Sequence, residues 1–334
     1  MAKQYDHTTP NTELVAAFAS RIAGSTVLVT GVSPGGLGSQ FLKEIMVADP
    51  STLILAGRTP SKFQATADEI ASVKPDISLK LLEIDLASFK SVREAAETVN
   101  SWTDIPKIDV VVNNAGIMAP PYWATEDGHE SQIQVNHLSH FLFTNLIMDK
   151  ILASGSPRIV SVASNGARYG GIRWDDLNSG NGERYDPFLS YAQSKTANML
   201  FAVGLADRLG KRGLTAVSMH PGIVLGTQLP HGTYTTKEQF FQDMLATEDK
   251  YGTKFRSNQI PESEMKSERN SVATHIFTAF SPGITSEKLN GGYFLDVRLA
   301  DPWQNETYAW CRDTIDADRL WKLSEEIVGQ TFDY

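Results

Sequence analysis

The sequence contains one cysteine, Cys311, among 334 residues, and it has no long hydrophobic run. A single cysteine excludes a disulfide within the chain and is typical of a protein from a reducing compartment. A membrane-spanning helix needs about 18 or more consecutive apolar residues, and no stretch approaches that length. The first residues, MAKQYDHTTPNTELVAAF, include Asp6 and Glu13 and do not resemble a signal peptide. These absences predict a cytoplasmic protein without a membrane partner.

Basic residues are also scarce. The chain has 30 Lys and Arg against 39 Asp and Glu, which gives a formal net charge of −9. Because nucleic-acid backbones are bound by clustered Lys and Arg, this balance argues against a nucleic-acid partner. The apolar fraction of 41% is ordinary for a globular protein. No repeat or low-complexity linker divides the chain, so we expect residues 1–334 to form a single domain.

The chain alternates short apolar runs with helical patterns. Near-continuous runs of Val, Ile and Leu are typical of strands in a parallel sheet that is covered on both faces. Seven such strands are predicted, at residues 26–31, 52–57, 79–86, 108–114, 158–164, 214–220 and 291–297. One of the helices between them is expected at 59–73, with Thr59 as its N-cap and Pro60 at its first position. The alternation predicts an α/β protein with one doubly wound, mainly parallel seven-stranded sheet and helices on both faces.

Two segments interrupt the alternation. Residues 165–189 are rich in Gly, Asn and Asp and are expected to form a loop over the sheet. Residues 225–270 are longer and mix charged with aromatic residues. Segments of this length within a compact domain often cover a functional site, so 225–270 is predicted to be a substrate-binding lid.

A glycine-rich segment, TGVSPGGLG at 30–38, joins the first predicted strand to a helix. The ATP-binding P-loop is excluded because Gly38 is followed by Ser39 and Gln40 rather than by Lys and Ser or Thr. The G-x-G-x-x-G pattern fails too, since position 41 is Phe. Glycines at this place can still let the backbone approach a pyrophosphate at a helix N-terminus. A plain turn between strand and helix is the alternative.

Tyr191 and Lys195 of YAQSK are four residues apart, and therefore on one face of the helix predicted at 190–209. A nearby ammonium favours the phenolate and would bring the tyrosine pKa from about 10 towards ~7. Such a tyrosine can exchange a proton with the oxygen of a carbonyl or an alcohol.

Ser164 ends the fifth predicted strand, where it would hold the same oxygen or cap a turn. Asn136 lies among apolar residues of a helical pattern and needs a partner, either structural or functional.

These motifs occur in the order found in a known family. A glycine loop after the first strand, NNAG (113–116) after the fourth, Ser164 after the fifth and then Tyr-x-x-x-Lys resemble the short-chain dehydrogenase/reductase superfamily, which has a Rossmann-type fold. The resemblance extends over roughly residues 22–300. TEDGHESQIQVNHLSHFLFTNLI, YAQSKTANMLFAVGLADRL and RLWKLSEEIVG are similar to the branch of retinol dehydrogenases and WW-domain oxidoreductases.

The resemblance implies a role for each motif residue. Tyr191 would be the catalytic acid/base, and Lys195 would bind the nicotinamide ribose and lower the tyrosine pKa. Ser164 would orient the substrate oxygen, and Asn136 would support a water-mediated proton relay. Tyr191 and Lys195 would also contact the cofactor, together with Gly31, Gly36, Leu37, Gly38, Asp85, Leu86, Asn113, Ala115, Gly116, Pro221, Gly222, Ile223, Val224 and Thr227. The expected substrate contacts are Met118, Trp123, Asn165 and Tyr169. Because family members often dimerise through the helices that carry Asn136 and Tyr191, a homodimer is also expected.

The sequence departs from the family pattern at two places. Gly31 and Gly36 enclose four residues where the family usually has three. A one-residue bulge at Pro34 and Gly35 would keep Gly36 and Gly38 at the helix entrance. Thr227 stands one place later than the threonine of the family's PGxVxT pattern, so its contact with the nicotinamide carboxamide is open.

The cofactor is predicted from the end of the second strand, LILAGRTP. It lacks the acidic residue that commonly binds the ribose diol of NAD. The guanidinium of Arg58 can bind a 2′-phosphate, and Ser33 could add a hydrogen bond, although a merely exposed arginine is the alternative. NADP(H) is therefore expected.

No metal is expected, because His137 and His140 have no evident third ligand.

Together these features predict an NADP(H)-dependent oxidoreductase. It would transfer a hydride between the nicotinamide and a ketone or secondary alcohol. The aromatic residues around the site suggest a sizeable, partly apolar small molecule, such as a polyketide, terpenoid, steroid or retinoid. Two alternatives stay open: a non-catalytic NADP-binding sensor or scaffold, and an epimerase or dehydratase that acts through a ketone intermediate.

Overall fold

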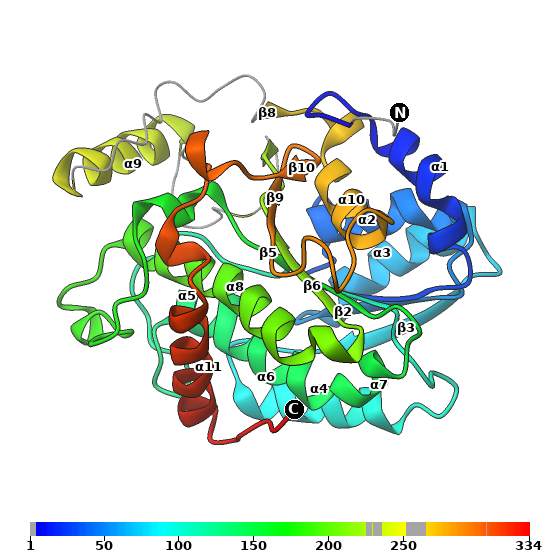
Figure 1. The fold of residues 1–334 in the computed structure, drawn as a ribbon, viewed down its shortest axis with the longest axis horizontal. Helices are drawn as coiled ribbons and strands as arrows, with labels where there is room; N and C mark the ends of the chain where they lie inside the picture. The colour runs from blue at the N-terminus through cyan, green and yellow to red at the C-terminus, as the bar shows by residue number, and fades with distance from the viewer. Residues whose placement is uncertain (1–4, 225–228, 230–235, 252–264, 305) are drawn as a thin grey trace.

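A computed structural model describes residues 5–224, 229, 236–251, 265–304 and 306–334. Its centre is an eight-stranded sheet in the order β10-β9-β6-β5-β4-β1-β2-β3. Helices surround this sheet (Figure 1). The strands are β1 (Thr26–Thr30), β2 (Thr52–Gly57), β3 (Ser78–Glu83), β4 (Val110–Asn113), β5 (Arg158–Val162), β6 (Thr215–Met219), β9 (Tyr293–Leu295) and β10 (Arg298–Leu299). All neighbours pair in parallel except β10, which is antiparallel to β9. The doubly wound, mainly parallel sheet is confirmed.

The predicted number of strands was wrong, because the sheet has eight strands and not seven. The eighth, β10, follows β9 through a tight turn in which Asp296 and Val297 have positive φ angles. It has only two residues, and both are exposed, so it leaves no apolar run in the sequence. Its pairing depends on the turn rather than on burial.

The order of the strands reverses between β1 and β4. From β1 the chain adds β2 and β3 on one side, and from β4 it adds β5 and β6 on the other. At the carboxyl ends, Thr30 pairs with Ala56, and Asn113 pairs with Ser161. In open α/β sheets the crevice beyond such a reversal is the usual place for a ligand.

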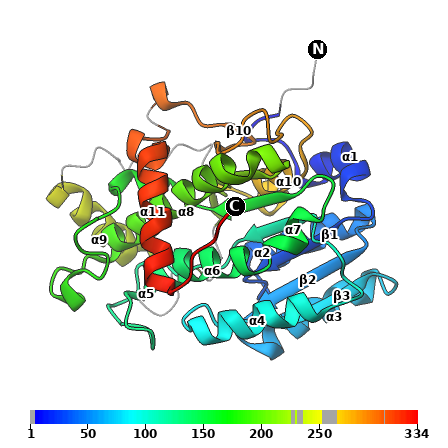
Figure 2. The ribbon, with the colours of Figure 1, turned by 60° about the horizontal axis from the view of Figure 1, so that its bottom comes forward.

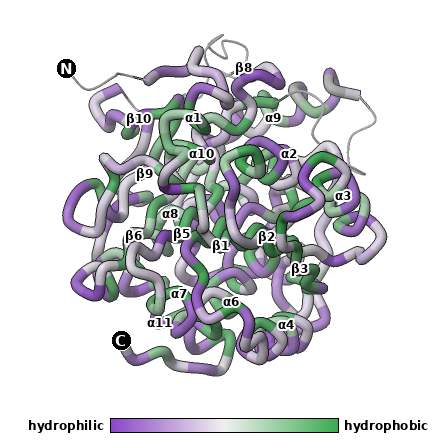
Figure 3. The backbone as a smooth tube through the Cα atoms, turned by 90° about the vertical axis from the view of Figure 1, so that its right-hand side faces the viewer, coloured by the Kyte–Doolittle hydropathy of each residue, from purple (hydrophilic) through white to green (hydrophobic). Residues whose placement is uncertain are grey.

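Helices cover both faces of the sheet. One face packs on α1 (Asn11–Ile22), α2 (Leu37–Ile45), α3 (Pro60–Val73) and α10 (Ala273–Phe280). The other face packs on α4 (Phe89–Ser101), α6 (Ser139–Leu146) and α8 (Pro187–Leu209), and α11 (Thr314–Val328) covers these helices from the outside. Hydrophobic segments run through the middle of the molecule, where the strands lie, and hydrophilic ones are common at its periphery (Figure 3). In the described parts of the chain, no helix is long and apolar enough to cross a membrane.

The helical pattern around Asn136 is not one regular helix. It divides into α5 (Ser131–Ile133), a π-helical turn at Gln134–Leu138, α6 and α7 (Met148–Leu152). Asn136 lies in the π-helical turn, which changes the register of the backbone hydrogen bonds. Such turns are frequent at functional sites.

The carboxyl-terminal helix α11 lies across α8 and beside α6 (Figure 2). The ring of Trp321 packs edge-on against Phe141 with centroids 4.9 Å apart, and the guanidinium of Arg208 lies 4.3 Å from the Trp321 ring. The apolar faces that were expected to meet a second copy are therefore covered within the same chain. A homodimer stays a prediction.

The predicted lid at 225–270 is described only in part. Its described elements are α9 (Lys237–Tyr251) and β8 (Met265–Lys266), and β8 pairs with β7 (Ile223–Val224). Helix α9 packs on α8, with the rings of Phe240 and Phe188 5.6 Å apart. Thr227 lies outside the described residues.

Candidate active site

The glycine loop brings β1, β4 and α2 so close together that side chains do not fit. A Cβ atom on Gly31 would lie 2.7 Å from the Cα of Ala115, and one on Gly38 would lie 2.6 Å from the carbonyl oxygen of Gly31. Gly31 also has a φ of 75°, which favours glycine. Gly36 occupies the N-cap position of α2, and Leu37 is the first helical residue. This backbone cradle at a helix N-terminus suits a pyrophosphate.

The extra residue of the loop is accommodated without disturbing this cradle. Gly35 has a φ of 75°, and no described atom lies within 4 Å of the place where its Cβ would be. The N–H of Gly36 donates to the carbonyl oxygen of Ser33 at 3.0 Å and closes a turn. The loop therefore bulges outwards at Pro34 and Gly35 and keeps Gly36 and Gly38 at the helix entrance.

A hydrogen-bond network joins the loop to the NNAG segment. The amide of Asn114 donates to the carbonyl oxygens of Thr30 at 2.8 Å and Gly31 at 3.1 Å. In return, Thr30 Oγ1 accepts the backbone N–H groups of Asn114 and Ala115, each at 3.0 Å. The sequence interpretation missed Thr30 and Asn114, although both stand inside the motifs it used. The side chain of Asn113 points elsewhere, and donates to Thr144 of α6 at 3.0 Å.

The four predicted catalytic residues come together at the carboxyl ends of β4 and β5. The Tyr191 hydroxyl is hydrogen-bonded to Ser164, and Lys195 Nζ lies 5.6 Å from the centroid of the Tyr191 ring. A Cβ on Gly116 would lie 3.0 Å from Asn136 Oδ1 and 3.4 Å from Lys195 Nζ, which shows how closely these two groups border Gly116. The cluster therefore combines a phenol, a hydroxyl, an amine and an amide.

Three of these side chains, those of Asn136, Lys195 and Ser164, are hydrogen-bonded to the backbone. Asn136 binds Ile117 twice, with Oδ1 accepting its N–H at 2.8 Å and Nδ2 donating to its carbonyl at 3.0 Å. Lys195 Nζ donates to the carbonyl of Val162 at 2.9 Å. Ser164 Oγ accepts the N–H of Gly166 at 3.0 Å, so it caps a turn as well as meeting Tyr191. Ser164 can therefore cap this turn and hold a substrate oxygen beside Tyr191 at the same time.

The expected lowering of the Tyr191 pKa is contradicted. Burial raises the pKa of Tyr191 to about 12, against the opposing effect of the hydrogen bond with Ser164. Burial also lowers the pKa of Lys195 to about 7. The prediction assumed a fully charged lysine next to the phenol. Because both groups are removed from water, the lysine loses much of its charge near neutral pH, and its effect on the phenol is correspondingly weak.

The remaining cofactor-side residues lie along the same edge of the sheet. Asp85 and Leu86 follow β3, and Asp85 Oδ1 accepts the N–H of Ala87 at 2.9 Å. Arg58 follows β2, is exposed, and has no ion-pair partner among the residues that the structure describes. Ser33 is half-buried in the glycine loop. Pro221–Val224 follow β6, and Gly222 has a φ of 85°.

Comparison with known proteins agrees with this arrangement. Residues 25–238 match the family model of the short chain dehydrogenases. The chain belongs to this family. It is 35% identical to an uncharacterized oxidoreductase of Schizosaccharomyces pombe over 285 residues, which covers 83% of this chain and 78% of that protein. It is 34% identical to retinol dehydrogenase 14 of Homo sapiens over 322 residues, which covers 92% of this chain and 87% of the relative. The retinol dehydrogenase-like branch and a dehydrogenase or reductase activity are thus confirmed.

The chain is also similar to a solved structure over most of its length. That structure is of a Beutenbergia cavernae protein that is predicted to be an NAD(P)-dependent gluconate 5-dehydrogenase, and it contains NADP at low occupancy. The TM-score is 0.57 and the identity 25%, over 82% of this chain and 95% of that one.

The expected substrate residues of the dehydrogenase divide into three groups. Met118 and Tyr169 pack with Phe188, Phe240 and Met244, so they meet α9 of the predicted lid. Asn165 is buried and accepts a hydrogen bond from the Tyr293 hydroxyl at 2.9 Å. Trp123 is 39% exposed and lies outside this apolar cluster. The sequence interpretation also missed Glu248 of α9, which accepts the Tyr169 hydroxyl at 2.9 Å, because nothing distinguishes it from the other acidic residues of 225–270.

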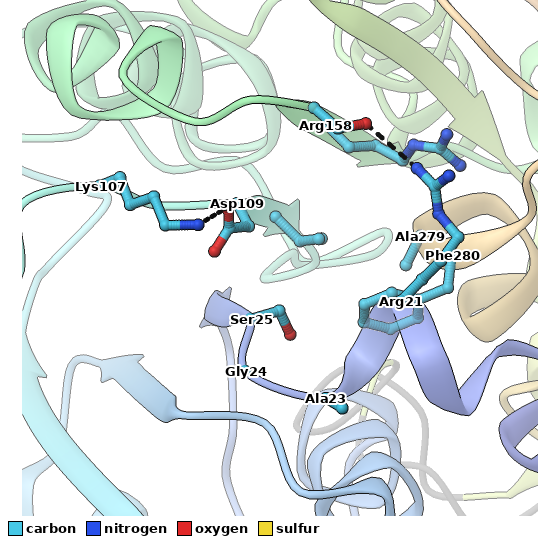
Figure 4. A pocket seen from close by; sticks show the side chains of 11 residues that line it. Arg21, Ala23, Gly24, Ser25, Lys107, Asp109, Arg158, Ala279 and Phe280 are labelled. Atoms are coloured by element: carbon cyan, nitrogen blue, oxygen red, sulfur yellow. Dashed lines mark hydrogen bonds and ion pairs between the residues drawn. The ribbon is translucent and has the colours of Figure 1, made fainter.

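A hollow of about 270 Å³ lies at the opposite edge of the sheet of the dehydrogenase, where β1, β4 and β5 begin (Figure 4). The charged side chains that line this hollow form ion pairs or hydrogen bonds with other groups of the chain. Lys107 pairs with Asp109 at 2.8 Å, Arg21 donates to Ser156 at 3.1 Å, and Arg158 donates to the carbonyl of Thr278 at 2.9 Å. We assign no ligand to it. In the described parts of the chain, no group of three or more His, Cys, Asp and Glu could hold a metal.

The glycine cradle of the dehydrogenase can be tested by Gly38→Ala. The new Cβ would meet the carbonyl of Gly31 at 2.6 Å and Asn114 Nδ2 at 2.7 Å, which forces the loop away from β4. We expect NADPH affinity, measured by cofactor fluorescence, to fall about 100-fold, or ~2.7 kcal/mol. The control is Gly35→Ala, where the space is open and only the positive φ resists the substitution. Equal losses in both variants would contradict a cradle at Gly38.

Proposed function

We propose that the protein is an NADP(H)-dependent oxidoreductase that interconverts a ketone and a secondary alcohol in a sizeable, partly apolar substrate. The observation that carries this proposal is the cluster of Ser164, Tyr191, Lys195 and Asn136 beside the glycine cradle. The nicotinamide cofactor, when bound, supplies or accepts the hydride.

The side chains supply the proton and the orientation. Ser164 and Tyr191 share a hydrogen bond, so their hydroxyls can hold one carbonyl oxygen between them. Tyr191 donates its proton to that oxygen as the oxygen gains negative charge, or removes the proton in the reverse direction. Lys195, whose pKa is near 7, is suited to pass a proton back towards Tyr191. Asn136, held through Ile117, keeps the backbone beside Gly116 in place for this transfer.

The substrate class follows from the lining beyond Tyr191. Met118, Phe188, Phe240 and Met244 form an apolar cluster with Tyr169. The names of the retinol dehydrogenase relatives support a lipophilic substrate, without requiring a retinoid. The test is NADPH consumption with a panel of ketones of increasing size and apolar area, measured together with NADPH and NADH binding. Failure of the purified protein to bind either cofactor would overturn the proposal.

The preference for NADP(H) is proposed to depend on Arg58. Arg58 is exposed at the end of β2 and is not engaged by another described residue, so its guanidinium is available to a 2′-phosphate. The similar structure that contains NADP supports this choice. We expect Arg58→Ala to weaken NADPH binding about tenfold, or ~1.4 kcal/mol, and to leave NADH binding unchanged. The control is Lys211→Ala, which removes an exposed cation after α8. An equal effect on both cofactors would contradict the assignment.

A further inference from the structure

His140 is a buried residue of α6 that contacts two different parts of the candidate site. Its Nδ1 lies 3.1 Å from the backbone oxygen of Asn136, one turn earlier, and its Nε2 lies 2.9 Å from Thr30 Oγ1 at the end of β1. The side chain is 2% exposed. One imidazole ring therefore touches both the π-helical turn that carries Asn136 and the strand that leads into the glycine loop.

The hydrogen bonds determine which ring nitrogen carries the proton. A backbone carbonyl can only accept, so Nδ1 must be the donor to Asn136. In a neutral ring Nε2 is then the acceptor, and the Thr30 hydroxyl donates to it. Burial lowers the pKa of His140 to about 4, and Lys195 acts in the same direction, which keeps the ring neutral. With its proton directed at His140, Thr30 Oγ1 has its lone pairs free for the N–H groups of Asn114 and Ala115.

We propose that His140 is a positioning residue that couples the Asn136 turn to the cofactor cradle. The Nδ1–H fixes the backbone of Asn136, whose side chain clamps Ile117 beside Gly116. The Nε2 fixes the rotation of Thr30, which holds the NNAG segment against Gly31. The inference rests on the proposed function, because the cradle is assigned there to NADP(H).

His137 provides a matched comparison on the same stretch of chain. It is as deeply buried as His140, and its pKa is lowered to about 3 by burial. Its Nε2 bonds Ser324 of α11 at 2.9 Å, and Ser324 in turn donates to the carbonyl of Leu320. Because the Ser324 proton is used there, His137 must be the donor and carries its proton on Nε2. The two neighbouring histidines are therefore expected in opposite tautomers, and only His140 faces the site.

Nitrogen-15 NMR of the imidazole rings in the full-length protein tests the geometry without any substrate. We expect His140 to give the signals of a neutral ring with its proton on Nδ1, and these signals should disappear in His140→Asn. His137 should give the signals of a neutral ring with its proton on Nε2, and these should disappear in His137→Asn. A His140 ring with its proton on Nε2, or a protonated ring at neutral pH, would overturn the inference.

Two substitutions separate the two contacts of His140. The amide of Asn lies near the position of Nδ1 and keeps the donor to Asn136, whereas the amide of Gln reaches the position of Nε2 and keeps the acceptor for Thr30. We expect His140→Asn to weaken NADPH binding about tenfold, whereas His140→Gln should bind NADPH within about twofold of the wild type. Amide hydrogen exchange should accelerate at Asn114 and Ala115 in the first variant, and at Ile117 in the second.

The outcomes distinguish this inference from the proposed function. If the wild type binds neither NADPH nor NADH, the proposed function fails, whatever tautomer His140 adopts. If the wild type binds NADPH and the Asn and Gln variants lose affinity equally, His140 is only a packing residue and the inference fails. His137→Asn should lower stability and leave NADPH binding unchanged, and a tenfold loss in that variant would also overturn the inference.

Discussion

Replacing Tyr191 with Phe is expected to lower kcat by about 10²–10⁴-fold, the usual contribution of a positioned acid or base, while NADPH binding stays within about twofold of the wild type. The substitution removes the hydroxyl that meets Ser164 and leaves the ring, which packs against Gly166. Because the ring and its packing are kept, we expect the variant to fold like the wild type. The measurement is kcat at saturating NADPH with the best ketone of the panel, together with cofactor fluorescence.

The matched control for this variant is Tyr185→Phe. The Tyr185 hydroxyl donates to the carbonyl of Pro120 at 2.7 Å and accepts the Gln132 amide at 2.9 Å, so it holds a loop and not a reacting group. Its removal should leave kcat within a few-fold of the wild type. Retention of most of the turnover by Tyr191→Phe would place the acid/base elsewhere. Unchanged biological activity would favour the non-catalytic sensor.

The protonation state of Tyr191 bears on the direction of the reaction. With a pKa near 12, the phenol is protonated at neutral pH, and the protonated form is the one that can donate to a carbonyl oxygen. Oxidation of an alcohol needs the phenolate, which becomes more abundant as the pH rises. If Tyr191 is the acid/base of the proposed reaction, its protonated phenol suits carbonyl reduction at neutral pH.

The fold was largely predictable because burial in a parallel sheet leaves a direct mark on the sequence. In β1, β5 and β6 every residue is buried, and each strand appeared as an apolar run. The exposed β10 depends on a turn and left no such mark. The π-helical turn at Asn136 was also invisible, because the apolar spacing around it resembles that of a regular helix.

The sequence predicted the motif residues of the candidate site. It did not predict the residues that hold these motif residues in place. Tyr191 and Lys195 share a helix face by spacing alone. Thr30, Asn114 and His140 are supports that meet through contacts between distant parts of the chain, which no local pattern reports. The sign of the Tyr191 pKa shift failed for the same reason, since it depends on how completely the folded chain excludes water from both Tyr191 and Lys195.

Replacing Trp321 with Ala is expected to reduce the free energy of unfolding by about 3–5 kcal/mol, as for other buried Trp residues cut back to Ala. Trp321 is 3% exposed and packs on Phe141 of α6, on Phe201 of α8 and under the guanidinium of Arg208. The substitution leaves a cavity between α11 and the two helices that carry Tyr191, Lys195 and His140. The measurement is urea unfolding followed by fluorescence and circular dichroism.

Ile315→Ala on the same helix separates this packing from helix propensity. Ile315 is 77% exposed, so its truncation should change stability by no more than about 0.5 kcal/mol. If Trp321→Ala costs less than about 1 kcal/mol, α11 does not cover α6 and α8 as tightly as its contacts indicate. If the variant instead self-associates, the loosened α11 has exposed the apolar faces of α6 and α8. A second copy would then occupy the surface that α11 covers in the intact chain. In the intact chain, α11 stabilises α6 and α8, the helices that carry residues of the candidate site.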